Sequence, residues 1–220
     1  MRALWFMAIL FLIVGSVGNG RAEEIIGTKP LLAITRHDLA TILPSDYRIL
    51  ADSPSMEQFL DALDGAPPDW SQVYGQGHHD PGHDERLFAL NRERDAKRAG
   101  QEALKWTVAF FWSGELSRYE PAVGGFSIVM GPIFTPTRWG LVRFKAEDLP
   151  GNLFAVPEAS QLESLRRQVS AGQTINIEIV MIGKLMPEES LVYDFSHEEE
   201  GRGLIMPVVR IERVEYLLAR

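Results

Sequence analysis

The stretch whose residue types are best suited to metal binding or catalysis combines three histidines with three carboxylates within eight residues: His78, His79, Asp80, His83, Asp84 and Glu85. Imidazole and carboxylate groups together bind zinc, nickel, copper or manganese. If a helix begins near Pro81, His83 on its first turn could share an ion with His79 or Asp80, and Asp84 or Glu85 could complete the coordination. A divalent-metal site is therefore one prediction, although the spacing matches no established signature such as H-E-x-x-H.

The same stretch also fits a simple helix start, and the pattern favours this second interpretation. Asp80 would cap the helix and Pro81 would occupy its first position. The acids that follow would lie near the positive end of the helix dipole, where negative charge is stabilising. In this interpretation the histidines are exposed and bind no physiological ion.

Two further groups of residues could bind or react with a ligand. Nine aromatic residues lie between Trp106 and Phe144, and most of them are expected in the core. Trp139, which follows a proline-broken loop, is the one expected to form a surface platform that stacks on a sugar ring or a base. The acidic stretch formed by Asp194, His197 and Glu198–Glu200 could hold a cation or an acid/base pair, but it is typical of a solvated hairpin tip.

Familiar catalytic signatures are missing from the sequence. It contains no G-x-S-x-G elbow, no phosphate-binding loop and no dinucleotide fingerprint. It also contains no cysteine, which excludes disulfides, thiolate nucleophiles, thiolate metal sites and lipoprotein anchoring. Carboxylate-dependent hydrolases leave almost no local signature, so a hydrolase of envelope polysaccharide stays open as an alternative function.

The first 22 residues have the layout of a signal peptide. Arg2 precedes an apolar run from Ala3 to Val14, and small residues then lead to Gly20-Arg21-Ala22. The apolar run is shorter than the roughly 17–25 residues that span a bilayer. We expect cleavage after Ala22 and a soluble protein outside the cytoplasm, either periplasmic or secreted. An uncleaved membrane anchor is the competing interpretation.

The mature chain is acidic and rich enough in apolar residues to build a core. Cleavage leaves 20 basic and 30 acidic side chains, a formal net charge of −10. An acidic surface repels the phosphate backbone, so nucleic acid is not an expected partner. Hydrophobic residues make up 45% of the sequence, and the mature length suits one domain or two small ones.

Residues 23–104 are predicted to form an acidic, mainly helical region. The clearest helix spans residues 53–65, where Ser53 and Pro54 open it, apolar residues recur every three or four positions, and Gly65 closes it. A charged helix is expected from about Asp84 to Ala103.

Residues 105–220 are predicted to be β-rich, with one inserted helix at about residues 158–171. The β-branched and aromatic run Trp106–Trp112 favours a strand covered on both faces. Pro207 indicates that the last strand is an edge strand or carries a bulge there. The order of three strands, a helix and two or three strands resembles the OB-fold, a partly closed barrel; an open antiparallel sheet is the alternative. The predicted class is α+β.

One resemblance to a known group accompanies these patterns. The signal peptide, the charged helix Asp84–Asp95, the aromatic strand and the segment from Tyr119 to Phe126 resemble bacterial exported proteins grouped only as a family of unknown function. The likeness covers about residues 55–170 and implies no catalytic residue.

The sequence therefore favours a non-enzymatic binding or assembly module at the cell envelope. Its expected partner is an envelope protein or a saccharide, and no obligatory cofactor is expected. Divalent-metal binding through the stretch from His78 to Glu85 is the first alternative function, and hydrolysis of envelope polysaccharide is the second.

Overall fold

The computed structural model describes residues 27–76, 80–197 and 201–218. The strands are β1 (Thr28–Leu32), β2 (Arg48–Leu50), β3 (Thr107–Glu120), β4 (Gly125–Pro132), β5 (Thr135–Thr137), β6 (Gly140–Val142), β7 (Lys145–Glu147), β8 (Phe154–Val156), β9 (Asn176–Leu185), β10 (Leu191–Phe195) and β11 (Gly203–Leu218). The α-helices are α1 (Leu39–Ile42), α2 (Ser53–Asp64), α3 (Trp70–Tyr74), α4 (His83–Arg98) and α5 (Ala159–Ser170), with 3-10 turns at Arg36–Asp38 and Glu102–Lys105.

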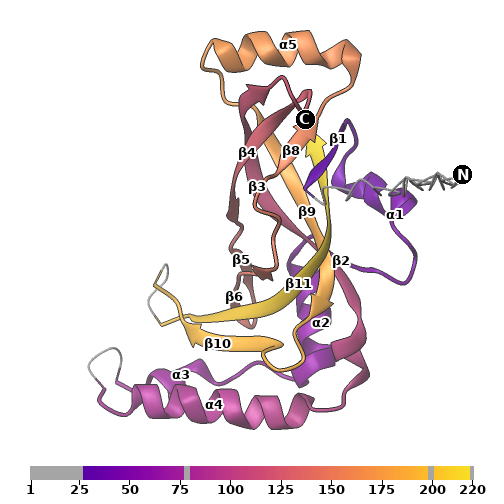
Figure 1. The fold of residues 1–220 in the computed structure, drawn as a ribbon. Coiled ribbons are helices and arrows are strands. Elements are labelled where there is room, and N and C mark those ends of the chain that lie inside the picture. The colour runs from indigo at the N-terminus through magenta and orange to yellow at the C-terminus, as the bar shows by residue number, and fades with distance from the viewer. Residues whose placement is uncertain (1–26, 77–79, 198–200, 219–220) are drawn as a thin grey trace, which may run out of the picture.

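Six of the strands close into a barrel (Figure 1). Around the barrel they follow the order β1, β8, β4, β3, β9 and β11, and β11 pairs back with β1. Strand β1 runs parallel to both of its neighbours, whereas the other contacts around the ring are antiparallel. Strands β2, β5, β6, β7 and β10 extend the sheet beyond this ring.

This architecture overturns the predicted fold class. The region 23–104 is not mainly helical, because its strand β1 belongs to the barrel and its strand β2 pairs with β3. The sheet is neither open nor partly closed, since β1 completes the ring between β8 and β11. The sequence pattern concealed β1 because Lys29 and Pro30 interrupt the apolar alternation by which a strand is recognised.

The strand expected to be covered on both faces is confirmed in β3. Val108 and Phe110 pack into the main core, while Ala109 and Phe111 pack into a second core that includes Leu39 of α1. Strand β9, beside β3, divides its residues in the same way. The barrel wall formed by β3 and β9 therefore has apolar packing on both sides, which explains its nearly continuous apolar sequence.

The expectation that Pro207 marks an edge strand or a bulge is wrong. Strand β11 pairs with β1, β6, β7, β9 and β10, and its bulge lies between Ile211 and Arg213. Parallel pairing with β6 ends at Ile205, and parallel pairing with β7 begins at Val208. Pro207 lies between these two stretches, where its missing N–H costs no ladder hydrogen bond.

The helix predicted over residues 53–65 is confirmed as α2, with Asp52 rather than Ser53 as its cap. The Asp52 carboxylate accepts the Ser55 N–H at 2.9 Å, and the Ser55 hydroxyl oxygen accepts the Asp52 N–H at 3.2 Å. The Ser55 hydroxyl also donates to the Asp52 carboxylate, and this bond, together with that from the Ser55 N–H, lowers the pKa of Asp52. Such a capping box satisfies two otherwise unpaired donors and fixes the first turn of α2.

Helices lie at both ends of the barrel, whereas α1 lies beside it (Figure 1). Helix α5, predicted at about residues 158–171, is confirmed and lies across one end, where Leu165 packs into the main core. Helices α3 and α4 lie across the other end, next to β10. None of the helices in the described part of the chain is both long enough and apolar enough to cross a lipid bilayer.

Helix α4 covers the outer edge of β10 with polar side chains. The Asn91 amide donates to the Tyr193 carbonyl and accepts the Tyr193 N–H, each at 2.9 Å. Arg98 donates to the Leu191 carbonyl at 3.0 Å. At Leu191 and Tyr193 these bonds take the place of a neighbouring strand, so this part of the β10 edge is less open to pairing with another chain.

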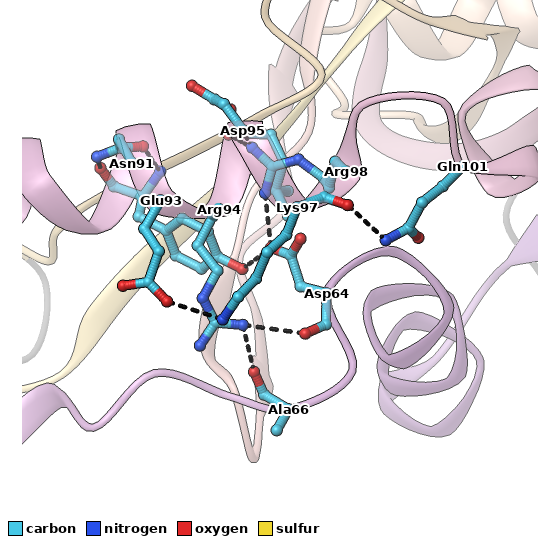
Figure 2. Close-up of polar contacts among 11 residues, drawn as sticks. Asp64, Ala66, Asn91, Glu93, Arg94, Asp95, Lys97, Arg98 and Gln101 are labelled. Atoms are coloured by element: carbon cyan, nitrogen blue, oxygen red, sulfur yellow. Dashed lines mark hydrogen bonds and ion pairs between the residues drawn. The ribbon is translucent and has the colours of Figure 1, made fainter.

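A buried ion pair joins α2, α4 and β10, and we call it the Asp64–Arg98–Tyr193 clamp (Figure 2). Arg98 Nη1 lies 2.6 Å from Asp64 Oδ2, and the two side chains are 1% and 0% exposed. The Tyr193 hydroxyl donates to the same Asp64 oxygen. Burial and the adjacent Asp64 charge raise the pKa of Tyr193, so its hydroxyl stays protonated and keeps this role as donor.

Candidate functional site: a pocket beside strand β2

A cavity of about 500 Å³ lies between β2, α2 and the start of β3. Its walls are residues 47–50, Ser55, Gln58, Phe59 and Trp106. This volume falls within the range of roughly 300–1,000 Å³ that is usual for small-ligand sites. The cavity therefore has the size of a binding pocket for a small molecule or for one unit of a polymer.

Local sequence places each wall of this pocket. Strand β2 is held by parallel pairing with β3, which sets Arg48 opposite Val108. Trp106 lies just before β3 and packs against the main core. Phe59 belongs to the buried face of α2 and contacts Trp106, with the ring centroids 6.4 Å apart and the planes at 40°. The apolar walls are therefore continuous with the core, and this continuity fixes their geometry.

Among the described residues that line the pocket, only Arg48 is charged. Its guanidinium carbon lies 4.7 Å from the centroid of the Trp106 ring, which is a cation–π contact. Within the described residues, Arg48 has no carboxylate partner, and its side chain is exposed. The pocket thus carries one positive charge that the described part of the protein does not neutralise.

The pocket lining is mostly apolar and uncharged. Its described residues include no histidine, aspartate, glutamate or lysine, which are common general acids and bases. Its one serine, Ser55, is already engaged, because its hydroxyl hydrogen-bonds with Asp52 and with the Ala51 N–H. The Asp52 carboxylate beside this hydroxyl is a weak base, because the hydrogen bonds that it accepts from the Ser55 hydroxyl and N–H lower its pKa.

The predicted metal site lies only partly within the described residues. His78 and His79 fall outside them. Asp80 accepts the N–H of Gln76 at 3.1 Å and that of Gly82 at 2.9 Å, and it pairs with Arg86. These three partners lower the pKa of Asp80 to about 2, the backbone bonds more than Arg86.

The remaining predicted ligands are similarly placed. His83 Nδ1 lies 2.7 Å from the Asp80 carbonyl oxygen, and its Nε2 lies 3.1 Å from Asp84 Oδ1. The His83 ring packs on Phe195, and Asp84 and Glu85 are exposed at the start of α4. Within residues 27–76, 80–197 and 201–218, no three histidine or acidic side chains are arranged to hold an ion. A metal site that uses His78 and His79 stays a prediction.

Asp80→Asn should destabilise the protein in a pH-dependent manner. Because the folded pKa of about 2 lies below the ordinary 3.8, the charged Asp80 stabilises the folded state above about pH 4, and this contribution is lost as the pH falls through about 2. Urea unfolding of the wild type and of Asp80→Asn should therefore give a stability difference that shrinks between about pH 5 and pH 2. Asp46→Asn, on an exposed loop, is the control. If the stability difference between the wild type and Asp80→Asn does not change with pH, the charge of Asp80 does not contribute to stability.

Trp139 does not form the surface platform that the sequence suggested, because its side chain is 0% exposed. Its indole N–H donates to Asp61 at 3.2 Å, and its carbonyl accepts the Trp70 indole N–H at 2.6 Å. Arg138, next to it, pairs with Asp61 and Glu57 of α2. The proline-broken loop therefore packs onto α2, and the Trp139 ring offers no face to a ligand.

The acidic hairpin tip is described only at its margins. Asp194 accepts the N–H of its neighbour Phe195 at 2.8 Å, which is a local contact within the strand end. His197 is exposed, and Glu198–Glu200 lie outside the described residues. A cation site or an acid/base pair at this tip therefore stays untested.

The residues that build the pocket were missed by the sequence reasoning. Trp106 was assigned to the core as one aromatic residue among many. No sequence pattern marked Arg48 or Gln58 as a ligand-binding residue. Arg48 belongs to a strand of three residues, which is too short for a periodic pattern. The parallel pairing of β2 with β3 is what brings Arg48 close to Trp106, and a short parallel pair leaves no local signature.

Comparison with known proteins adds no name to this site. No protein-family model, no curated protein and no solved structure matches the chain. The resemblance to exported proteins of a family of unknown function therefore stays a prediction, and function has to be argued from the pocket itself.

Proposed function

We propose that this protein is an exported, non-enzymatic binding module of the cell envelope, and that the pocket beside β2 is its ligand site. One observation carries the proposal: a cavity of about 500 Å³ presents aromatic walls and a single unneutralised arginine, without an acid/base pair in its lining. Ligand sites combine apolar walls with a few polar groups in this way.

Export is supported by the N-terminal sequence. Arg2, the apolar run that follows it and the small residues before Glu23 have the layout of a cleaved signal peptide. The partner that this location implies is an envelope protein or a saccharide. Mass spectrometry of tag-free protein recovered from the envelope fraction tests export, and a chain that begins at Glu23 is the expected result. A chain that retains residues 1–22 would contradict cleavage.

Filling the pocket should abolish ligand binding. Gln58 is an exposed residue of the pocket wall, so Gln58→Trp adds bulk inside the cavity without disturbing the core. A ligand present at about 100 times its dissociation constant stabilises the folded state by about 2.7 kcal/mol, which raises the melting temperature by about 5–10 °C in a protein of this size. We expect this shift in the wild type but not in Gln58→Trp.

The control for this experiment is Gln173→Trp, which adds the same bulk beside α5, away from the pocket. A panel of envelope saccharides, peptides and small organic acids is screened by thermal unfolding against all three proteins, and each stabilising compound is checked for turnover. Equal stabilisation of Gln58→Trp and the wild type would place the ligand elsewhere. Turnover of a compound would contradict the non-enzymatic role.

A further inference from the structure

We propose that the pocket beside β2 recognises a ligand that carries a carboxylate on a ring with an apolar face, and that Arg48 binds this carboxylate. This inference rests on the proposed function and names its ligand class. Uronic sugars and aryl acids both have this chemistry, because a sugar ring presents a face of C–H groups and an aryl ring is flat and apolar.

The stacking of Arg48 on Trp106 leaves its hydrogen-bond donors available. A guanidinium contacts an aromatic ring through its flat face, while its N–H groups lie in its own plane and form a fork that matches a carboxylate. The contact with Trp106, at 4.7 Å from the ring centroid, therefore orients Arg48 without using its donors. An oriented donor loses less conformational entropy when the ligand binds.

Two other stacked arginines in the described part of the chain have the carboxylate partner that Arg48 lacks, whereas Arg92 over Phe88 and Arg143 over Phe134 resemble Arg48 in having none. Arg36 lies 4.4 Å from the Phe111 ring centroid, and its guanidinium pairs with Glu178 at 2.7 Å. Arg166 lies over Tyr119 and within 3.7 Å of a Glu163 oxygen. In both cases a carboxylate of the protein occupies the position that the ligand's carboxylate would take at Arg48.

The lining of the pocket favours a single negative charge on the ligand. Arg48 is the only cation among the described residues of the lining. Its single charge balances that of one carboxylate, whereas a doubly charged phosphate would need a second cation. Tyr47 and Gln58 also line the cavity and offer uncharged hydrogen-bonding groups to the second carboxylate oxygen.

The apolar walls define where the ring of the ligand lies. Phe59 and Trp106 meet at 40° with their centroids 6.4 Å apart, and Leu50 adds an aliphatic surface. Two aromatic walls at such an angle form a corner that buries the apolar face of one ring. Stacking against aromatic side chains is a general source of affinity for a flat or ring-shaped ligand.

The test uses two acids and their uncharged counterparts: benzoate with benzyl alcohol, and glucuronate with glucose. Dissociation constants are measured by calorimetry for the wild type, Arg48→Met, Arg48→Lys and Gln58→Trp. Because a hydrogen bond to a charged group contributes about 1.5–3 kcal/mol, at least one acid should bind the wild type about tenfold or more tightly than its counterpart. Arg48→Met should remove this preference, and Arg48→Lys should restore part of it. Which acid binds more tightly distinguishes an aryl ligand from a saccharide.

The outcomes separate this inference from the proposed function. Equal binding of an acid and its uncharged counterpart, unchanged binding of the acid by Arg48→Met, or no binding of either acid up to its solubility limit would overturn the inference. If the uncharged compounds bind and Gln58→Trp removes that binding, the proposed function stands without the carboxylate. If Gln58→Trp leaves the binding of every compound unchanged, the pocket is not the site and both fail. Arg48 is exposed, so its substitution leaves the core intact, and thermal unfolding of each variant checks this.

Discussion

Arg98→Met should lower the free energy of unfolding by about 3–5 kcal/mol, because it leaves the Asp64 carboxylate buried without its cation. The Asp64 side chain is 0% exposed, so water cannot replace the lost partner. The substitution also removes the donor to the Leu191 carbonyl at the edge of β10. Urea unfolding at neutral pH measures the loss.

Two further variants show whether burial of the charge is the cause. Lys97→Met removes the exposed pair with Glu93 on the same helix and should change stability by about 0.5 kcal/mol or less. Asp64→Leu combined with Arg98→Met removes both charges and should recover a large part of the stability lost in Arg98→Met. If Arg98→Met and Lys97→Met have similar effects, α4 is not held by the Asp64–Arg98–Tyr193 clamp.

Trp139→Ala is expected to cost about 3–5 kcal/mol, the second large effect. The ring is fully buried, so its removal leaves a cavity where α2 and the β5–β6 hairpin pack together, and large cavities of this kind carry such costs. The Asp61 oxygen also loses the indole N–H. Thermal and urea unfolding report the loss.

The control for Trp139 is Phe88→Ala on α4. Phe88 is also aromatic but 63% exposed, so its removal should alter stability by no more than about 0.5 kcal/mol. A small effect of Trp139→Ala, similar to that of Phe88→Ala, would mean that the ring is accessible in solution and would revive Trp139 as a stacking platform.

The sequence predicted those elements whose signals are local. Helices α2 and α5 have regular apolar spacing and ends marked by capping residues or glycine. The strand run Trp106–Trp112 is β-branched and aromatic on both faces, and it forms β3 with core on both sides. In each case the residue pattern within one element is sufficient to predict that element, because the element packs along its whole length.

Barrel closure depends on a strand partner that is distant in the chain, and no local pattern indicates such a partner. Strand β1 pairs with β8 and β11. Lys29 and Pro30 nevertheless give its sequence a pattern that is typical of a loop. The helix predicted from Asp84 to Ala103 ends earlier, at Arg98, and Gly100 follows with a φ of +81°. Register and closure are set by pairing between strands, which a single sequence does not display.

The candidate site was hidden for the same reason. Asp80 and His83, which the sequence suggested as metal ligands, instead form hydrogen bonds with neighbouring residues at the start of α4. Arg48 looked like an ordinary surface cation, and only the fold places it against Trp106. Likewise, the charged stretch of α4 gave no sign that Arg98 alone is buried, because its partner Asp64 lies on another helix.

The most direct test of the account follows the tryptophan indole signals of ¹⁵N-labelled protein by NMR during titration with benzoate and, separately, with glucuronate. We predict a saturable shift of the Trp106 indole signal and of the amides of Arg48 and Gln58, while the signals of buried Trp139 stay in place. The same titration of Gln58→Trp should leave Trp106 unchanged. If neither acid moves the Trp106 signal, or if the shifts gather on another face of the barrel, the pocket beside β2 is not the binding site.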